Sequence, residues 1–126
     1  MFADTKAYSG FAVDDLQKAK KFYGETLGLR MSDVDPENGL MALHISGSRD
    51  ILVYLSPSHT PASFTILNFP VENVEEAVDE LMRRGVRFER YDGFEQDEKG
   101  INRGAGPPIA WFKDPAGNIL SVTTQD

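Results

Sequence analysis

FAVDDLQKA at residues 11–19 returns as FPVENVEEA at residues 69–77, and this repeat decides the fold. Phenylalanine, valine and alanine recur at the same three places in both stretches, each 58 residues apart. Self-similarity at a fixed spacing indicates that one structural unit of about sixty residues occurs twice. We therefore expect a single domain made of two repeats, at about 1–58 and 62–126.

Each repeat is expected to place one amphipathic helix after its first strand. Asp14 or Asp15 suits the amino end of the first helix, and Asn73 suits that of the second, because short polar side chains accept hydrogen bonds from free helix amides. Gly28 and Gly85 suit the carboxyl ends, where a left-handed residue closes the helix. Alternation and turn residues place the strands at about 7–13, 29–34, 40–46, 50–55, 64–71, 86–91, 109–113 and 118–124.

Two stretches resemble the vicinal oxygen chelate superfamily, which includes glyoxalases, extradiol dioxygenases and bleomycin-resistance proteins. FAVDDLQKAKKFY at residues 11–23, followed by LGL at 27–29, resembles the first strand and helix of that family. FKDPAGNIL at residues 112–120 resembles the turn between its last two strands. The resemblance implies an α+β fold in which two βαβββ modules form an open curved mixed sheet with helices outside. A ligand would occupy the hollow of that sheet.

The resemblance also locates the family's metal ligands, and this chain departs from them. The four strand positions correspond here to Tyr8, Tyr54, Ile66 and Ser121, and the last of these is normally a glutamate. Divalent ions in proteins prefer imidazole nitrogens or carboxylate oxygens, which none of these side chains supplies. The sequence therefore predicts no family metal site and no cofactor.

The remaining lining of the hollow follows from strand alternation. If Tyr8 points inward, the inward side chains are largely apolar with a few phenol, amide and hydroxyl groups, as in many small-molecule sites. The same side chains are as readily explained as the filling of a closed core. Arg103 lies between glycines in the irregular stretch 92–108, where a guanidinium can clamp an anionic ligand, and Trp111 can stack on a planar one. The predicted ligand-binding residues are Tyr8, Tyr54, Phe64, Asn68, Arg103, Trp111 and Ser121.

No catalytic residue can be assigned from the sequence. His44 has two interpretations: a functional residue, acting as a base or a metal ligand, or a partly exposed strand residue without a role. The strand residue is the favoured interpretation. His59 lies in the two-proline connector at 56–61 and is more often solvated there. No paired-histidine metal motif occurs, and Ser121 lacks the Gly-x-Ser-x-Gly turn that presents a hydrolase nucleophile.

Composition excludes several classes of partner. The chain has 126 residues, no cysteine and a net charge of −7. A negative protein repels phosphate backbones and anionic membranes, so neither nucleic acid nor membrane is expected as a partner. No apolar run approaches the roughly 20 residues of a membrane helix. The first residues lack a basic stretch followed by an apolar one, which favours the cytoplasm.

Three functions remain open. The leading hypothesis is a small-molecule binder of the bleomycin-resistance type, for which the resemblance implies a homodimer with ligand pockets shared by two chains. The glycines and prolines of the segment 93–108 predict that this loop orders over a bound ligand. The second is a glyoxalase-like lyase or dioxygenase-like oxidoreductase with a metal at displaced positions, such as His44, His59 or the loop carboxylates. The third is an interaction module that accepts a peptide at a sheet edge.

Overall fold

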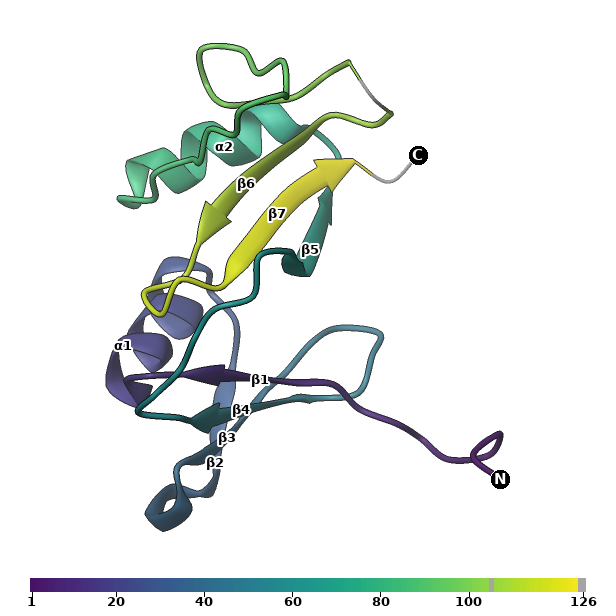
Figure 1. Cartoon of the computed structure of the whole chain (residues 1–126), viewed down its shortest axis with the longest axis vertical. Coiled ribbons are helices and arrows are strands. Elements are labelled where there is room, and N and C mark those ends of the chain that lie inside the picture. The colour runs from purple at the N-terminus through teal and green to yellow at the C-terminus, as the bar shows by residue number, and fades with distance from the viewer. Residues whose placement is uncertain (105, 125–126) are drawn as a thin grey trace. The chain divides into compact units, whose positions relative to one another are not determined.

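The chain divides into two units, Met1–Thr60 and Pro61–Asp126, in a computed structural model that describes residues 1–104 and 106–124. Each unit contains one mixed sheet and one α-helix (Figure 1). Few helices and two mixed sheets make an α+β fold, as the sequence predicts. Within the described residues, no helix has both the length and the apolar character needed to cross a membrane.

The first unit has a four-stranded sheet in the order β1-β4-β3-β2. Strand β1 (Gly10–Val13) runs parallel to β4 (Ile51–Leu55), whereas β3 (Leu40–Leu43) is antiparallel to both β4 and β2 (Met31–Asp35). The expected β-α-β-β-β order is therefore present. Between the strands lie α1 (Leu16–Lys21), which continues as a π-helical turn (Phe22–Thr26), and a 3-10 turn (Pro36–Asn38).

Helix α1 and one face of this sheet enclose the core of the first unit. Asp15, rather than Asp14, caps the helix, because its side chain accepts a hydrogen bond from Lys18 N at 3.1 Å. Tyr23 is fully buried, with its ring centroid 5.6 Å from that of Phe11. The sheet contributes the alternate side chains that are buried: Phe11, Val13, Met41, Leu43, Ile51 and Val53.

The second unit has a three-stranded sheet in the order β5-β7-β6. Strand β5 (Thr65–Val71) is parallel to β7 (Ile119–Thr124), and β6 (Ile109–Lys113) is antiparallel to β7. Helix α2 (Val74–Arg83) packs against β6 and β7. The side chains on the buried face of the sheet include Ala110, Phe112, Leu120 and Val122.

The predicted ends of helix α2 are confirmed. The Asn73 side chain accepts a hydrogen bond from Glu76 N at 3.0 Å. Gly85 follows the helix with φ +91°, a left-handed conformation that costs glycine little and other residues more. The start and the end of α2 are thus both encoded locally.

The predicted strand at 86–91 is wrong. Only an isolated bridge joins Phe88 to Phe112. Beyond it, Tyr91 N donates to the Gln96 side-chain oxygen at 2.8 Å instead of to a neighbouring strand. The second unit therefore has one regular strand fewer than the expected module.

The turn between β6 and β7 is held by a buried carboxylate. Asp114 is 4% exposed, and its Oδ1 accepts hydrogen bonds from Ala116 N and Asn118 N, both at 2.9 Å. The Asn118 side-chain amide donates to Asp114 Oδ2 at 2.9 Å. Gly117 has φ +90°, and a Cβ added there would lie 3.0 Å from Pro61 Cγ. These contacts explain why the turn needs aspartate, glycine and asparagine at these places.

Candidate ligand-binding site

An apolar cavity of about 280 Å³ opens in the second unit. Strands β5, β6 and β7 each contribute to its wall, and the irregular segment after Phe88 contributes two aromatic rings. A register shift between Thr65 and Leu67 interrupts strict alternation in β5. The cavity is lined by Ser63, Phe64, Thr65, Tyr91, Phe94, Trp111 and Ile119.

Trp111 lies at the centre of an aromatic cluster. Its ring centroid is 5.6 Å from that of Tyr91, with an interplanar angle of 79°, and 5.3 Å from that of Phe94, at 45°. The edge-to-face arrangement of Trp111 and Tyr91 is one that aromatic pairs prefer. Phe94 and Phe64 are nevertheless 51% and 67% exposed. The cavity therefore presents aromatic surface that a flat apolar ligand can cover.

Tyr91 supplies the polar point of this cluster. Among the side chains that the structure describes, its hydroxyl is the buried polar atom that makes no hydrogen bond. Burial raises the pKa of Tyr91, and the nearby Glu89 carboxylate raises it further, so the phenol is neutral at physiological pH. A buried hydroxyl without a partner is unfavourable. It is therefore a candidate for a hydrogen bond to a ligand.

Asn68 and Ser121 are brought together next to Trp111. Ser121 on β7 pairs in register with Asn68 on β5 and with Trp111 on β6. The Ser121 hydroxyl donates to Asn68 Oδ1 at 2.6 Å, and the Ser121 side chain is fully buried. Ser121, at the position where the sequence resemblance predicts a glutamate, is thus hydrogen-bonded within its own sheet.

Tyr8 and Tyr54 belong to the first unit. Tyr8 is 61% exposed, and the guanidinium carbon of Arg49 lies 5.6 Å from the centroid of its ring. A cation over an aromatic face is an attractive arrangement. Tyr54 on β4 is also exposed. Both phenols are therefore accessible on their own unit.

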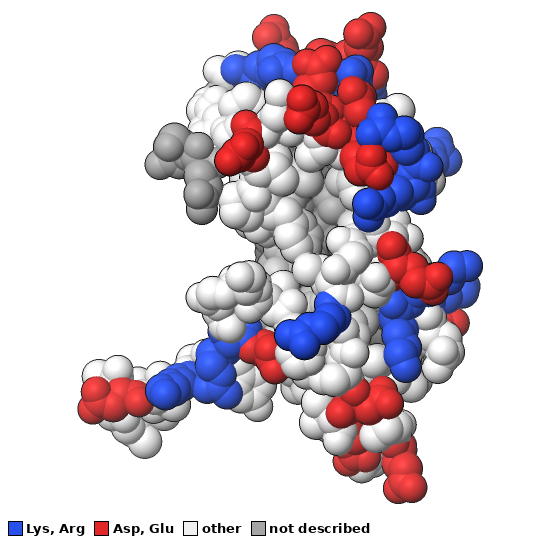
Figure 2. Space-filling view, turned by 180° about the vertical axis from the view of Figure 1, so that it is seen from behind, with Lys and Arg blue, Asp and Glu red and all other residues white. Residues whose placement is uncertain are grey.

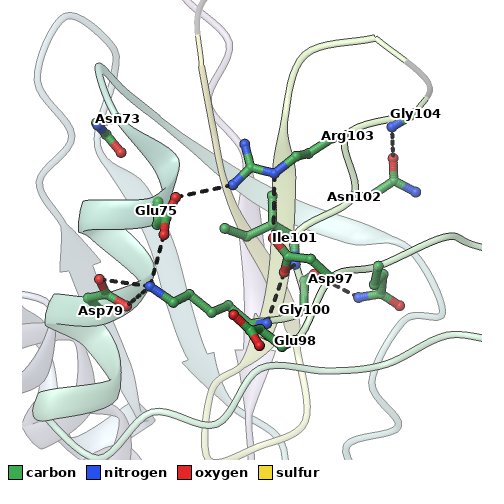
Figure 3. A network of polar contacts seen from close by, with 12 residues as sticks. Asn73, Glu75, Asp79, Asp97, Glu98, Gly100, Ile101, Asn102, Arg103 and Gly104 are labelled. Carbon is green, nitrogen blue, oxygen red and sulfur yellow. Dashed lines mark hydrogen bonds and ion pairs between the residues drawn. The ribbon is translucent and has the colours of Figure 1, made fainter.

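Arg103 lies among acidic side chains and not in the lining of the aromatic cavity (Figure 3). Its guanidinium contacts Glu75 Oε2 and Asp97 Oδ2, each at 3.4 Å. Lys99 Nζ contacts the same Glu75 at 3.0 Å and Asp79 at 2.9 Å. Two cations of the 92–108 segment are thus paired with carboxylates, two of which lie on helix α2. The role of Arg103 in ligand binding remains a prediction.

The ion pairs and the backbone hold residues 97–103 against α2. Ile101 is 1% exposed. The amides of Lys99 and Ile101 both donate to Asp97 Oδ1 at 2.9 Å. Burial alone would raise the pKa of Asp97, but these amides and the Arg103 guanidinium outweigh it, so the pKa is lowered. Hydrogen bonds to Asp79 and Glu75 raise the pKa of Lys99.

His44 contacts two side chains of the first unit. Its Nδ1 lies 2.9 Å from Asp50 Oδ1, and its Nε2 lies 2.9 Å from Ser32 Oγ. In the part of the chain that the structure describes, no group of three or more histidine, aspartate or glutamate side chains is arranged to hold a metal ion.

On the face shown in Figure 2, acidic and basic side chains are intermixed.

Tyr91 and Phe94 were not among the predicted site residues. Tyr91 was expected to end a strand, and Phe94 falls in a segment where only Arg103 was expected to meet a ligand. The sequence feature that could have indicated these two residues is the pair of aromatic side chains near Gly93. Gly93 has φ +88° and turns the chain back. Their contact with Trp111 depends on that turn and is not visible in the sequence.

The chain was compared with models of known protein families. The family model described as "Glyoxalase/Bleomycin resistance protein/Dioxygenase superfamily" matches residues 7–122, so the chain belongs to this superfamily. The match confirms the resemblance carried by the two sequence stretches. No curated protein is similar enough in sequence to count as a relative.

Solved structures share the fold at low sequence identity. A putative glyoxalase family protein from Bacillus anthracis has a TM-score of 0.72 at 18% identity, with 100% of both chains covered. TnmS3, an antibiotic binding protein from Streptomyces sp. CB03234, has a TM-score of 0.65 at 24% identity, covering 98% of each chain. The fosfomycin resistance protein FosX from Mesorhizobium loti has a TM-score of 0.64 at 10% identity, covering 98% of this chain and 93% of its own.

Proposed function

We propose that this protein binds a flat, largely apolar small molecule in the cavity around Trp111, and that it does so without a metal ion. The observation that carries the proposal is the aromatic cluster itself, in which Trp111 contacts Tyr91 and Phe94 while Phe94 and Phe64 stay exposed. Covering such edges removes apolar surface from water, worth about 25 cal/mol per Å².

The charge of the chain narrows the ligand class. The cavity is lined mainly by apolar and aromatic side chains, and the net charge is −7. A negative field disfavours an anionic ligand. The expected ligand is therefore neutral or cationic, with a planar ring system and a polar group that hydrogen-bonds to Tyr91 Oη.

Two structural neighbours make binding a reasonable activity for this fold. TnmS3 is described as an antibiotic binding protein, and FosX as a fosfomycin resistance protein. Their identity to this chain is low, so they support the class of activity and name no ligand. Ligand contacts by Tyr8, Tyr54, Asn68, Arg103 and Ser121, none of which lines this cavity, remain separate proposals, and a homodimer remains the proposed assembly.

Trp111 gives a direct test, because it is the only tryptophan of the chain. Nile red, a neutral planar dye, is titrated into the protein while tryptophan emission is recorded. We expect saturable quenching of Trp111 in the wild type. Phe94→Ala should weaken binding by about 1 to 2 kcal/mol, roughly tenfold, because it removes one wall of the cavity.

Phe2→Ala is the matched control. Phe2 is 73% exposed and lies in the first unit, outside the cavity lining. Its variant should bind the dye like the wild type. Absence of saturable quenching, or equal binding by the Phe94→Ala and wild-type proteins, would show that the cavity is not the site.

A further inference from the structure

Three side chains of the first unit form a continuous hydrogen-bonded chain. Ser32 Oγ lies 2.9 Å from His44 Nε2. His44 Nδ1 lies 2.9 Å from Asp50 Oδ1. These distances fall in the range for a nucleophile and its base, with a third group that orients the base.

The register of the sheet brings the three side chains to one face. Ser32 on β2 is paired with Ala42 on β3, and His44 lies two residues beyond Ala42. Asp50 directly precedes β4, whose first residue Ile51 is paired with the buried Leu43. Because side chains alternate along a strand, Ser32, His44 and Asp50 all project from the face opposite Leu43.

The chemistry of the groups fixes the direction of the hydrogen bonds. An ionised carboxylate only accepts, so His44 must carry its proton on Nδ1 and donate it to Asp50. The lone pair of a neutral His44 is then on Nε2, and Ser32 donates its hydroxyl proton to it. This is the protonation pattern in which a histidine can remove the proton of a serine during attack on a carbonyl.

The serine is accessible to a substrate. Ser32 is exposed, and the side chains of His44 and Asp50 are 30% and 52% exposed. Leu52, the partner of Ala42, and Tyr54 lie on the same face of the sheet. They offer apolar surface on the face that presents the hydroxyl, two strands away from Ser32. The substrate class that fits is a small ester with an apolar acyl group.

We infer that Ser32, His44 and Asp50 form a nucleophilic site that hydrolyses small esters. Ser32 Oγ bonds to the acyl carbon as its proton passes to His44 Nε2, and the imidazolium gives that proton to the departing alcohol oxygen as the ester C–O bond breaks. A water molecule then attacks the acyl group, giving a proton to Nε2 that returns to Ser32 Oγ as the acid leaves. The net reaction is ester plus water to acid plus alcohol.

A fluorophosphonate probe tests this site without a known substrate. The serine oxygen forms a bond to phosphorus while fluoride leaves, so the adduct is stable and its position can be read by peptide mass spectrometry. We expect labelling of the full chain at Ser32. His44→Gln and Asp50→Asn should each slow labelling at least about tenfold, because general base catalysis typically contributes a factor of about a hundred or more.

Two control variants test whether labelling is specific to this site. Ser48→Ala removes a serine from the turn between β3 and β4 and should label like the wild type. Phe2→Ala changes an exposed side chain of the first unit that belongs to neither proposed site, and it should also label normally. Labelling at Ser32 and dye quenching of Trp111 are separate measurements, so failure of one proposal leaves the other intact. Circular dichroism checks that each variant is folded. Absence of labelling at Ser32, or equal labelling rates in the wild type and the folded His44→Gln variant, would overturn the inference.

Discussion

Asp114 is the residue whose loss should destabilise the second unit most clearly. Its buried carboxylate accepts two backbone amides and one side-chain amide. Asp114→Ala would leave these donors without that acceptor, at a cost of about 2 to 4 kcal/mol in the free energy of unfolding. Urea denaturation measures the change.

The control for Asp114 is an aspartate with few constraints. Asp14 is exposed and directly precedes Asp15, the capping residue of α1, and Asp14→Ala should change stability by no more than about 0.5 kcal/mol. Asp114→Asn should fall between the two variants, because its carbonyl oxygen still accepts from the backbone. Equal unfolding midpoints for Asp114→Ala and the wild type would contradict this account of the turn.

Asp97 should make the 97–103 segment sensitive to acid. Its pKa in the folded protein is lowered, so its stabilising effect is complete above the unfolded value of about 3.9 and is lost as the pH falls through the folded value. The amide resonances of Lys99 and Ile101, which donate to this carboxylate, report the titration. We expect a midpoint below about 3.9 and no such titration in Asp97→Asn. A midpoint at or above the ordinary value would contradict the contacts seen here.

At the scale of elements, local signals were sufficient for the helices. Asp15 and Asn73 cap the two helices with their own side chains, and Gly85 takes the left-handed conformation expected of it. Each signal acts within a few residues, so a sequence reveals it directly. The existence and ends of α2 were accordingly predictable.

The strand expected at 86–91 failed because its partners are not local. Val86 and Phe88 have strand-like character, yet the amide of Tyr91 is taken by the Gln96 side chain. The Arg90 guanidinium donates to the carbonyls of Asp97 and Glu98, which tightens the segment into a loop. A strand is defined by its ladder partners, and here side chains of the following loop compete for the backbone groups.

The residues of the candidate sites were also only partly predictable, because their contacts join segments that are distant in the sequence. Phe64 and Trp111 were predicted and share one cavity, whereas Tyr91 and Phe94 reach it through the loop that replaces the expected strand. The contacts of His44 with Ser32 and Asp50 depend on the register of β2, β3 and β4. Alternation within one strand predicts a face, but it does not predict which side chains of neighbouring strands meet.

Lys99 should control how firmly the loop is held on helix α2. Its Nζ contacts Glu75 and Asp79. Lys99→Met removes these ion pairs while keeping much of the side-chain volume. We expect faster amide hydrogen exchange at 97–103 and little change in the urea midpoint, because exposed ion pairs contribute little to global stability.

Lys20→Met serves as the comparison for Lys99, since Lys20 is an exposed lysine on α1. It should leave exchange at 97–103 unchanged. High salt should reproduce part of the Lys99→Met effect in the wild type, because it screens the same contacts. If exchange in this segment is the same in the wild type and Lys99→Met, the hydrogen bonds to Asp97 hold the loop without the lysine.

At the scale of the whole molecule, the repeat predicts the strand and helix that open each unit but not the chemistry of the two units. The first unit carries the polar chain of Ser32, His44 and Asp50, and the second carries the aromatic cavity. A repeated pattern records the apolar positions that form strands and helices, while exposed faces are free to differ. Function therefore has to be tested unit by unit.

Metal content is the property of the whole chain that best separates binding from the family's metal chemistry. Zinc sites in proteins usually need four ligands, or three and a water. The four positions that the sequence resemblance assigns to the family's ligands are Tyr8, Tyr54, Ile66 and Ser121, none of which is a histidine or a carboxylate, and His44 contacts a single carboxylate, that of Asp50, in the described residues. We expect far less than one bound metal ion per chain after purification without chelator, measured by plasma mass spectrometry.

Added metal should also fail to stabilise the protein. A ligand present at a hundred times its dissociation constant stabilises the folded state by about 2.7 kcal/mol, which a thermal melt with nickel, zinc, manganese or iron would detect. We expect no such shift. If metal addition does raise the melting temperature, the His44→Ala variant identifies where the metal binds. A shift that is lost in this variant comes from the His44 and Asp50 pair. One tightly bound ion per chain, retained in His44→Ala, would instead place a metal at other residues and favour the lyase or dioxygenase alternative.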